Sequence, residues 1–129
     1  MSERHVGRIA VVTGGANGIG RAYALRLATE GAVVGILDLA DGSGVVTQFE
    51  AAGGKAVAVR VDLTDATAVA GARDEVEAAV GPVQILVNNA GIYPNQPFEG
   101  MSADDWHRVF AINVDTMKRL YELPNIAGV

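Results

Sequence analysis

Four glycines follow a short apolar stretch near the start of the chain and form its clearest candidate site. The stretch from Ile9 to Val12 is apolar, and the glycines lie within the segment from Thr13 to Gly20. Apolar residues then recur at helical spacing, so the pattern predicts a strand, a tight turn and a helix. The free N–H groups at such a helix start favour an anion, and we expect a dinucleotide pyrophosphate there. The candidate cofactor-binding residues of this turn are Gly14, Asn17, Gly18, Ile19 and Gly20.

Three of these glycines are expected to have separate roles. Gly14 lets the chain turn sharply out of the strand. Gly18 leaves no side chain where a phosphate approaches the backbone, and Gly20 lets the first helical turn pack closely against the strand. The alternative interpretation is an ordinary strand-to-helix turn with flexible glycines.

A carboxylate, Asp38, stands at the end of the second apolar run. Such a carboxylate can accept two hydrogen bonds from a ribose diol, and it would repel the 2′-phosphate of NADP. The only basic residues between the turn and Asp38 are Arg21 and Arg26, which we expect to point along the first helix. We therefore expect Asp38 and its neighbour Leu39 to bind the cofactor and to favour NAD over NADP. The alternative is that Asp38 only caps the following segment.

Paired amides follow the fourth apolar run, in the sequence Asn88-Asn89-Ala90-Gly91. The amide side chains can bind neighbouring backbone and hold the strand ends together. The small Ala90 and Gly91 allow close backbone approach to a nicotinamide ribose. Asn89, Ala90 and Gly91 are therefore candidate cofactor-binding residues, and a simple turn is the alternative.

Asn113 is a polar residue on the apolar face of a long predicted helix. Ser102 is expected to cap this helix, with Asp105 as its capping-box partner. Trp106 and Phe110 are expected on the inward face. A buried amide needs hydrogen-bond partners, so Asn113 is either a satisfied core residue or a functional one.

Strand and helix patterns alternate along the whole chain. This alternation predicts parallel strands joined by right-handed crossovers, in one doubly wound, Rossmann-type α/β domain over residues 1–129. The third helix is expected to begin near Asp62, with Asp62 or Thr64 as its N-cap. The expected strands are 9–12, 32–37, 55–61 and 83–87, and the expected helices are 17–29, 44–52, 62–80 and a fourth from 102 to Pro124.

The composition excludes several other classes of function. The 129 residues carry a formal net charge of −5, which argues against nucleic acid and anionic membrane surfaces as partners. The chain has no cysteine, so disulfides and thiol chemistry are excluded, and we expect a reducing, cytoplasmic location. No apolar run is long enough to span a membrane. His5 and His107 have no paired ligands, so we expect no metal site.

Together these motifs resemble the short-chain dehydrogenase/reductase family. The resemblance rests on Thr13-Gly14-x-x-x-Gly18-x-Gly20, on Asn88-Asn89-Ala90-Gly91 and on the run from Val109 to Val114, and it covers about residues 7–117. It implies hydride transfer between a nicotinamide and an alcohol or carbonyl substrate, with strand order 3-2-1-4 in this part of the sheet. It also implies that Asp62, with Leu63, binds the adenine, and that Asn113 is a catalytic residue of the proton relay.

The family's catalytic Tyr-x-x-x-Lys pair has no counterpart in these 129 residues. None of the three tyrosines has a lysine four residues later, and the segment carrying the substrate-orienting serine is also missing. We therefore expect a truncated chain that is inactive alone, with 83–87 as an unpaired edge that promotes self-association or homo-oligomer formation. The alternatives are a noncatalytic NAD-binding module or an interaction module.

Overall fold

The strands of this protein form one parallel sheet. The computed structural model describes residues 4–90 and 100–111. In these residues the sheet has the order β3-β2-β1-β4, and every strand pair is parallel. The doubly wound fold and the order 3-2-1-4 are thus confirmed. The strands are β1 (Ile9–Thr13), β2 (Val33–Asp38), β3 (Lys55–Arg60) and β4 (Ile85–Val87).

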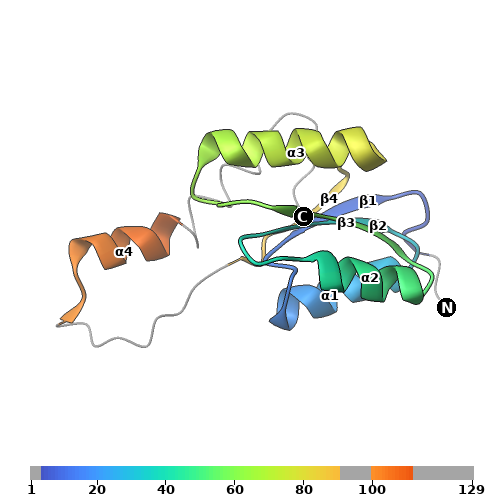
Figure 1. The fold of residues 1–129 in the computed structure, drawn as a ribbon, viewed down its shortest axis with the longest axis horizontal. Coiled ribbons are helices and arrows are strands. Elements are labelled where there is room, and N and C mark those ends of the chain that lie inside the picture. The colour runs from blue at the N-terminus through green and yellow to red at the C-terminus, as the bar shows by residue number, and fades with distance from the viewer. Residues whose placement is uncertain (1–3, 91–99, 112–129) are drawn as a thin grey trace.

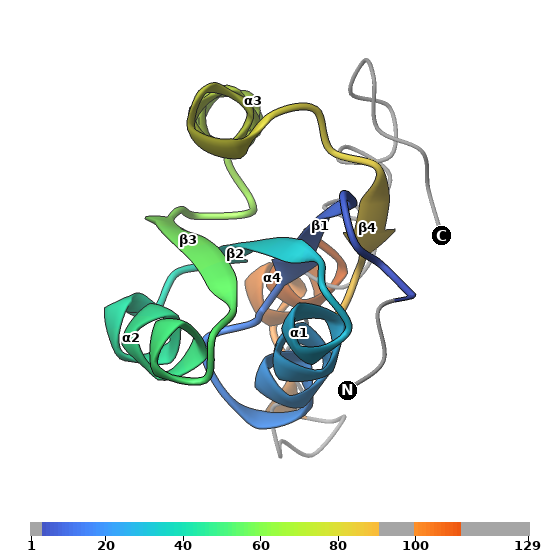
Figure 2. The ribbon, with the colours of Figure 1, turned by 90° about the vertical axis from the view of Figure 1, so that its right-hand side faces the viewer.

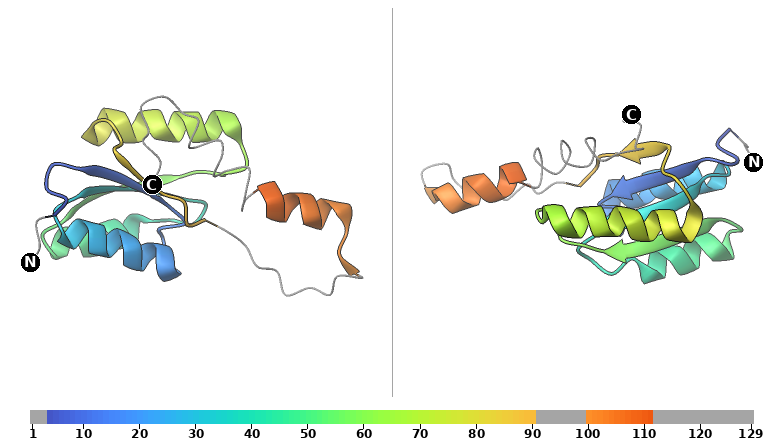
Figure 3. Two further views of the ribbon diagram at one scale, coloured as in Figure 1. Left: turned by 180° about the vertical axis from the view of Figure 1, so that it is seen from behind. Right: turned by 90° about the horizontal axis from the view of Figure 1, so that it is seen from above.

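Helices cover both faces of the sheet. Helices α1 (Gly18–Thr29) and α2 (Ser43–Ala51) lie on one face, and α3 (Ala66–Val80) lies on the other (Figure 1, Figure 2). Helix α4 (Ala103–Phe110) lies beyond the carboxyl ends of the strands, apart from both helical layers (Figure 3). No helix in the described residues is long and apolar enough to cross a membrane.

Two apolar clusters hold the helices to the sheet. Val34 and Ile36 of β2 pack with Phe49 on the side of α1 and α2. Leu37 packs on the other side, with Val76 of α3. Because β1 and β2 are buried on both faces, they are apolar at nearly every position, which is typical of parallel sheets.

The shortest strand, β4, differs from its predicted length. It covers three residues, Ile85–Val87, where 83–87 was expected. Its only partner in the described residues is β1, and the ladder begins at the pair Ala10 and Ile85. Because β1 itself begins at Ile9, residues before Ile85 have almost no strand beside them to pair with. Val83 is nevertheless buried, so its apolar character reflects packing alone.

The N-cap of α3 is a third residue that the sequence reasoning did not select. We expected Asp62 or Thr64, but the helix begins at Ala66 and its N-cap is Asp65. The Asp65 carboxylate accepts hydrogen bonds from the backbone N–H groups of Thr67 and Ala68, at 3.0 and 3.1 Å. Neither Asp62 nor Thr64 is therefore needed to cap the start of α3.

Helix α4 confirms one prediction and contradicts another. Ser102 and Asp105 form the predicted capping box. Trp106 and Phe110 were expected to face inward, but they are 48% and 42% exposed, and α4 has no buried residue. Their rings pack on each other instead, with centroids 4.9 Å apart. The described residues place no other element over this aromatic pair.

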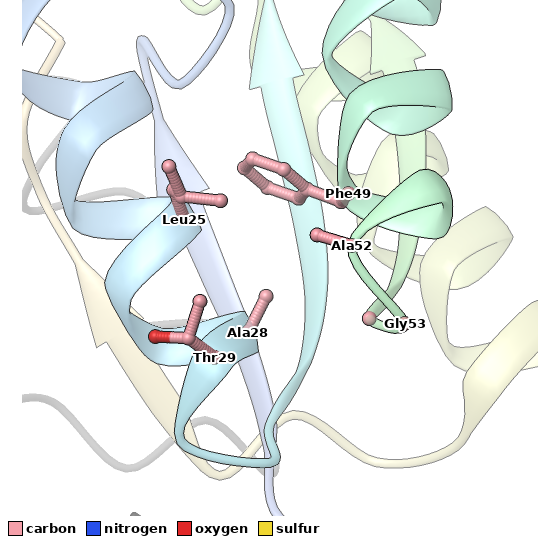
Figure 4. Close-up of a pocket in the computed structure, with 7 residues that line it drawn as sticks. Leu25, Ala28, Thr29, Phe49, Ala52 and Gly53 are labelled. Carbon is pink, nitrogen blue, oxygen red and sulfur yellow. The ribbon is translucent and has the colours of Figure 1, made fainter. Parts of the chain in front are cut away.

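A small cavity lies between the C-terminal parts of α1 and α2 (Figure 4). Its volume is about 20 Å³, enough for a water molecule and far too small for a cofactor. The residues that line it are Leu25, Ala28, Thr29, Phe49, Ala52, Gly53 and Gly54. This cavity is therefore not the cofactor site, and the predicted site residues that the structure describes lie at the carboxyl ends of the strands.

Candidate functional site

The turn between β1 and α1 has the geometry of an anion site. Gly14 and Gly18 adopt positive φ angles of 69° and 58°, where glycine carries no steric penalty. The N-cap Asn17 makes no side-chain cap, and no acidic residue lies in the first turn of α1. A Cβ atom on Gly18 would meet no protein atom within 4 Å. The backbone here is open to solvent, and the start of the helix has no side chain competing for its N–H groups.

Gly20 brings α1 close to the ends of β1 and β4. A Cβ atom on Gly20 would overlap the carbonyl oxygen of Gly14 and the side-chain amide of Asn89. The close packing predicted for Gly20 is present. Its neighbours are the backbone of Gly14 and the side chain of Asn89, which belongs to the paired-amide segment. The same amide donates to the Gly14 carbonyl oxygen at 3.3 Å.

The hydroxyl of Thr13 links β1 to the segment after β4. Thr13 is 1% exposed. Its Oγ1 accepts hydrogen bonds from the backbone N–H groups of Asn89 and Ala90, at 3.0 and 3.1 Å. It also donates a longer bond to the Val87 carbonyl, at 3.4 Å. The glycine-rich turn and the Asn89-Ala90 segment therefore form one hydrogen-bonded unit. The sequence analysis attributes the link between the strand ends to the amide side chains alone.

Asp38 faces this turn from the end of β2. One carboxylate oxygen accepts from Ala16 N–H at 3.1 Å, and the other accepts from Ala40 N–H at 3.0 Å. The local bond to Ala40 agrees with the capping alternative, whereas the bond to Ala16 reaches across to the glycine-rich turn. A carboxylate oxygen can accept more than one hydrogen bond, so a ribose hydroxyl could donate to either oxygen as well.

The positions of three arginines bear on the cofactor preference, because a basic residue beside Asp38 would attract a 2′-phosphate. Arg26 does point along α1, where it pairs with Glu30. Arg21 does not: its guanidinium bonds Gln48 of α2, so that expectation was wrong. Arg60 was overlooked, although the parallel register places it directly beside Asp38. No pattern near Asp38 could reveal it, because 22 positions of sequence separate the two residues.

Asp62 lies just past the end of β3 and is engaged by its own loop. Its Oδ1 accepts from the Thr64 hydroxyl at 2.7 Å and from the Thr64 backbone N–H at 2.9 Å. These bonds, the side-chain bond first, hold the pKa of the Asp62 carboxyl below its ordinary value. Leu63 is buried in the α3 core, whereas Leu39 is 61% exposed beside the site. An apolar ring could therefore contact the side chain of Leu39 but not that of Leu63.

The candidate residues gather at one edge of the sheet. The carboxyl ends of β1, β2, β3 and β4 carry Thr13, Asp38, Arg60 and the Asn88 segment. This edge of an open parallel sheet is where ligands bind. Among the residues that the structure describes, no group of histidine, aspartate or glutamate could hold a metal. Two predicted site residues, Gly91 and Asn113, lie outside the described residues.

The sequence of this chain is similar to a known family of enzymes. The family model for short chain dehydrogenases matches residues 8–122. The 2,5-dichloro-2,5-cyclohexadiene-1,4-diol dehydrogenase of Sphingobium indicum is 42% identical over 115 residues, which are 88% of this chain and 46% of that enzyme. The chain thus spans about half the length of this relative.

Two solved structures from Burkholderia are also similar. A short chain dehydrogenase/reductase from Burkholderia phymatum in complex with NAD has a TM-score of 0.89 at 32% identity, over 98% of this chain and 46% of that one. A short chain dehydrogenase from Burkholderia cenocepacia in complex with NADP has a TM-score of 0.85 at 38% identity, over 92% and 50%. Proteins of the same architecture therefore bind either cofactor.

Proposed function

The chain belongs to the short-chain dehydrogenase family, and from this premise we propose that it supplies the NAD-binding half of an oxidoreductase acting on small alcohols or ketones. The observation that carries the proposal is the hydrogen-bonded unit around Thr13. It places an uncapped helix start, two carboxyl-terminal strand ends and the Asp38 carboxylate at one edge of the sheet.

We assign each part of this edge to one part of the cofactor. The first turn of α1, at Gly18, Ile19 and Gly20, would hold the pyrophosphate through its N–H groups. The oxygens of Asp38 would accept from the ribose of the adenosine half, and the exposed Leu39 would lie against the adenine. Asn89, Ala90 and Gly91 would lie beside the nicotinamide ribose.

Asp38 is the reason to prefer NAD. Its carboxylate is fixed by two backbone N–H groups and cannot swing away from a 2′-phosphate without losing both bonds. Calorimetry with NAD and NADP tests this preference directly, and tighter binding of NADP would contradict it. Asp38→Ala should weaken NAD by about 1.5–3 kcal/mol, or about 10- to 100-fold, through loss of charge-assisted hydrogen bonds.

Hydride transfer is the chemistry that a nicotinamide cofactor supplies when bound. Asn113 would maintain the proton relay, as in the family. A positioned general acid typically contributes about 10²- to 10⁴-fold. The 129 residues contain no tyrosine with a lysine four positions later. We therefore propose that a polypeptide of these residues binds NAD without oxidising alcohols or reducing ketones.

The test is a panel of alcohols and ketones, followed by NADH absorbance, with the 129-residue polypeptide and with its Tyr93→Phe variant. Absence of turnover together with NAD binding is the expected result. Turnover that persists in Tyr93→Phe would overturn the proposed inactivity. Turnover lost in Tyr93→Phe would identify Tyr93 as a substitute acid and would also contradict the proposal.

We also propose that the chain associates with a second copy. Two surfaces support this: the aromatic pair Trp106 and Phe110, which is exposed, and β4, which has one partner strand in the described residues. Exposed aromatic pairs and unpaired strand edges both favour association.

A further inference from the structure

We propose that Arg60 is a second determinant of cofactor preference, because its guanidinium is placed to receive a 2′-phosphate beside Asp38. Cofactor choice would then be a balance between one fixed carboxylate on β2 and one guanidinium on β3. The inference rests on the proposed cofactor site, and it adds to that site a residue with the opposite effect from Asp38.

The parallel pairing of β2 and β3 brings the two residues together. Asp38 and Arg60 are the last register pair of the two strands, at the carboxyl edge of the sheet. Alternation along each strand puts both side chains on the face of α1 and α2, because Ile36 and Ala58, two positions earlier, pack in the cluster on that face. Neighbouring strands lie about 4.8 Å apart, so a phosphate beside Asp38 is also within reach of Arg60.

The guanidinium of Arg60 is held in place but remains available. Its Nε donates to the Leu39 carbonyl oxygen at 2.8 Å, and the residue is exposed. A guanidinium has five N–H donors, and this bond uses one of them. Within residues 4–90 and 100–111, Arg60 forms no ion pair with Asp38 within 4 Å. Its remaining donors can therefore bind a phosphate without first breaking a salt bridge.

The charge of Arg60 already acts on the same loop. The pKa of the Asp41 carboxyl lies below its ordinary value, chiefly because the Ser43 backbone N–H donates to it, with a smaller contribution from the positive charge of Arg60. The Leu39 carbonyl that Arg60 binds belongs to the loop that follows Asp38, so the guanidinium lies beside the place where the ribose end of the cofactor would bind. A planar, always charged guanidinium is well suited to phosphate recognition.

The experiment measures the dissociation constants of NAD and NADP by calorimetry for the 129-residue polypeptide and its Arg60 variants. Arg60→Gln removes the charge but keeps an N–H donor, whereas Arg60→Lys keeps the charge. We expect Arg60→Gln to weaken NADP by about 10- to 100-fold, as for a lost charge-assisted hydrogen bond, and to change NAD less than threefold. Arg60→Lys should retain most of the NADP affinity.

A second background makes the NADP effect easier to measure. Asp38→Asn keeps one acceptor oxygen but removes the charge, and it should raise NADP affinity. Adding Arg60→Gln to it should cancel that gain. Lys55→Gln is the matched control, because it removes the same charge from the other end of β3 and should affect neither cofactor. Circular dichroism melts check that every variant is folded.

Four outcomes would overturn the inference. Equal weakening of NAD and NADP by Arg60→Gln would mean that Arg60 acts only by holding the Leu39 loop. Loss of NADP binding in Arg60→Lys as large as in Arg60→Gln would show that its charge is irrelevant. If the unmodified polypeptide binds neither cofactor, the proposed function fails with it, whereas normal NAD binding with unaltered NADP binding in Arg60→Gln refutes this inference alone.

Discussion

Thr13→Val removes one buried hydroxyl and tests whether that hydroxyl organises the site. Valine has nearly the same shape as threonine, so the change leaves the volume of the core almost unaltered. It removes the acceptor for two backbone N–H groups, those of Asn89 and Ala90. The bond to Val87 is long, at 3.4 Å, and we assign no energy to its loss.

The expected cost follows from these two orphaned donors. A buried donor without an acceptor costs about 1–3 kcal/mol. Asn89 and Ala90 are only half-buried, so the lower end applies to each, and the total is about 2 kcal/mol. For a domain of this size, that loss lowers the melting temperature by about 7 °C. The segment carrying Asn89 should also loosen, which should weaken NAD binding.

Two further variants separate the hydroxyl from the methyl group. Thr13→Ser keeps the hydroxyl and removes one buried methyl, at a cost of about 1 kcal/mol. Thr47→Val makes the same chemical change on the exposed face of α2 and should stay within about 0.5 kcal/mol of the parent. Urea unfolding and NAD calorimetry on all three give the comparison. The reasoning is refuted if Thr13→Val is as stable as the parent, or more stable than Thr13→Ser.

Three other predictions concern the turn, the Asp62 loop and α4. Gly18→Val should abolish NAD binding in calorimetry and cost about 1–2 kcal/mol of stability, because valine must adopt the positive φ of 58°; normal NAD binding would contradict the pyrophosphate site. Thr64→Val should raise the pKa of Asp62, read from its NMR titration, and an unchanged pKa would contradict the assigned cause. Because the folded pKa is depressed, the bond stabilises the parent fully above the ordinary value of 3.8, and this stabilisation is lost as the pH falls through the folded pKa. The variant should therefore be less stable than the parent above pH 3.8 and equally stable below the folded pKa. Replacing Trp106 and Phe110 by serine should reduce the mass measured by light scattering toward that of one chain, and an unchanged mass would rule out the aromatic surface as the contact.

Several features could be predicted from the sequence because their causes are local. The glycine-rich turn was recognisable because a strand pattern changes to a helical one within a few residues of Gly14. The capping box of α4 joins Ser102 to Asp105, three residues apart, and one helical turn suffices to form it. The cap of α3 was harder, because Asp62, Thr64 and Asp65 are all suitable caps and only the start of the helix distinguishes them.

The placement of α4 shows a second limit. The spacing of Trp106 and Phe110 does indicate an apolar helix face, and that face exists. Whether another element covers it depends on the position of the helix, which its own residues do not determine. A period in the sequence identifies which side chains share a face, but only packing decides whether that face is buried.

By itself, the sequence determined the order of elements, the glycine-rich turn and the presence of a carboxylate after the second strand. The contacts that make a site of them required the tertiary structure. The Thr13 hydroxyl meets Asn89 across 76 positions, and Arg60 lies beside Asp38 because two parallel strands pair in one register. Local propensities act within a few residues, whereas strand register is set by packing across the whole sheet, so which charges become neighbours is decided only when the sheet forms.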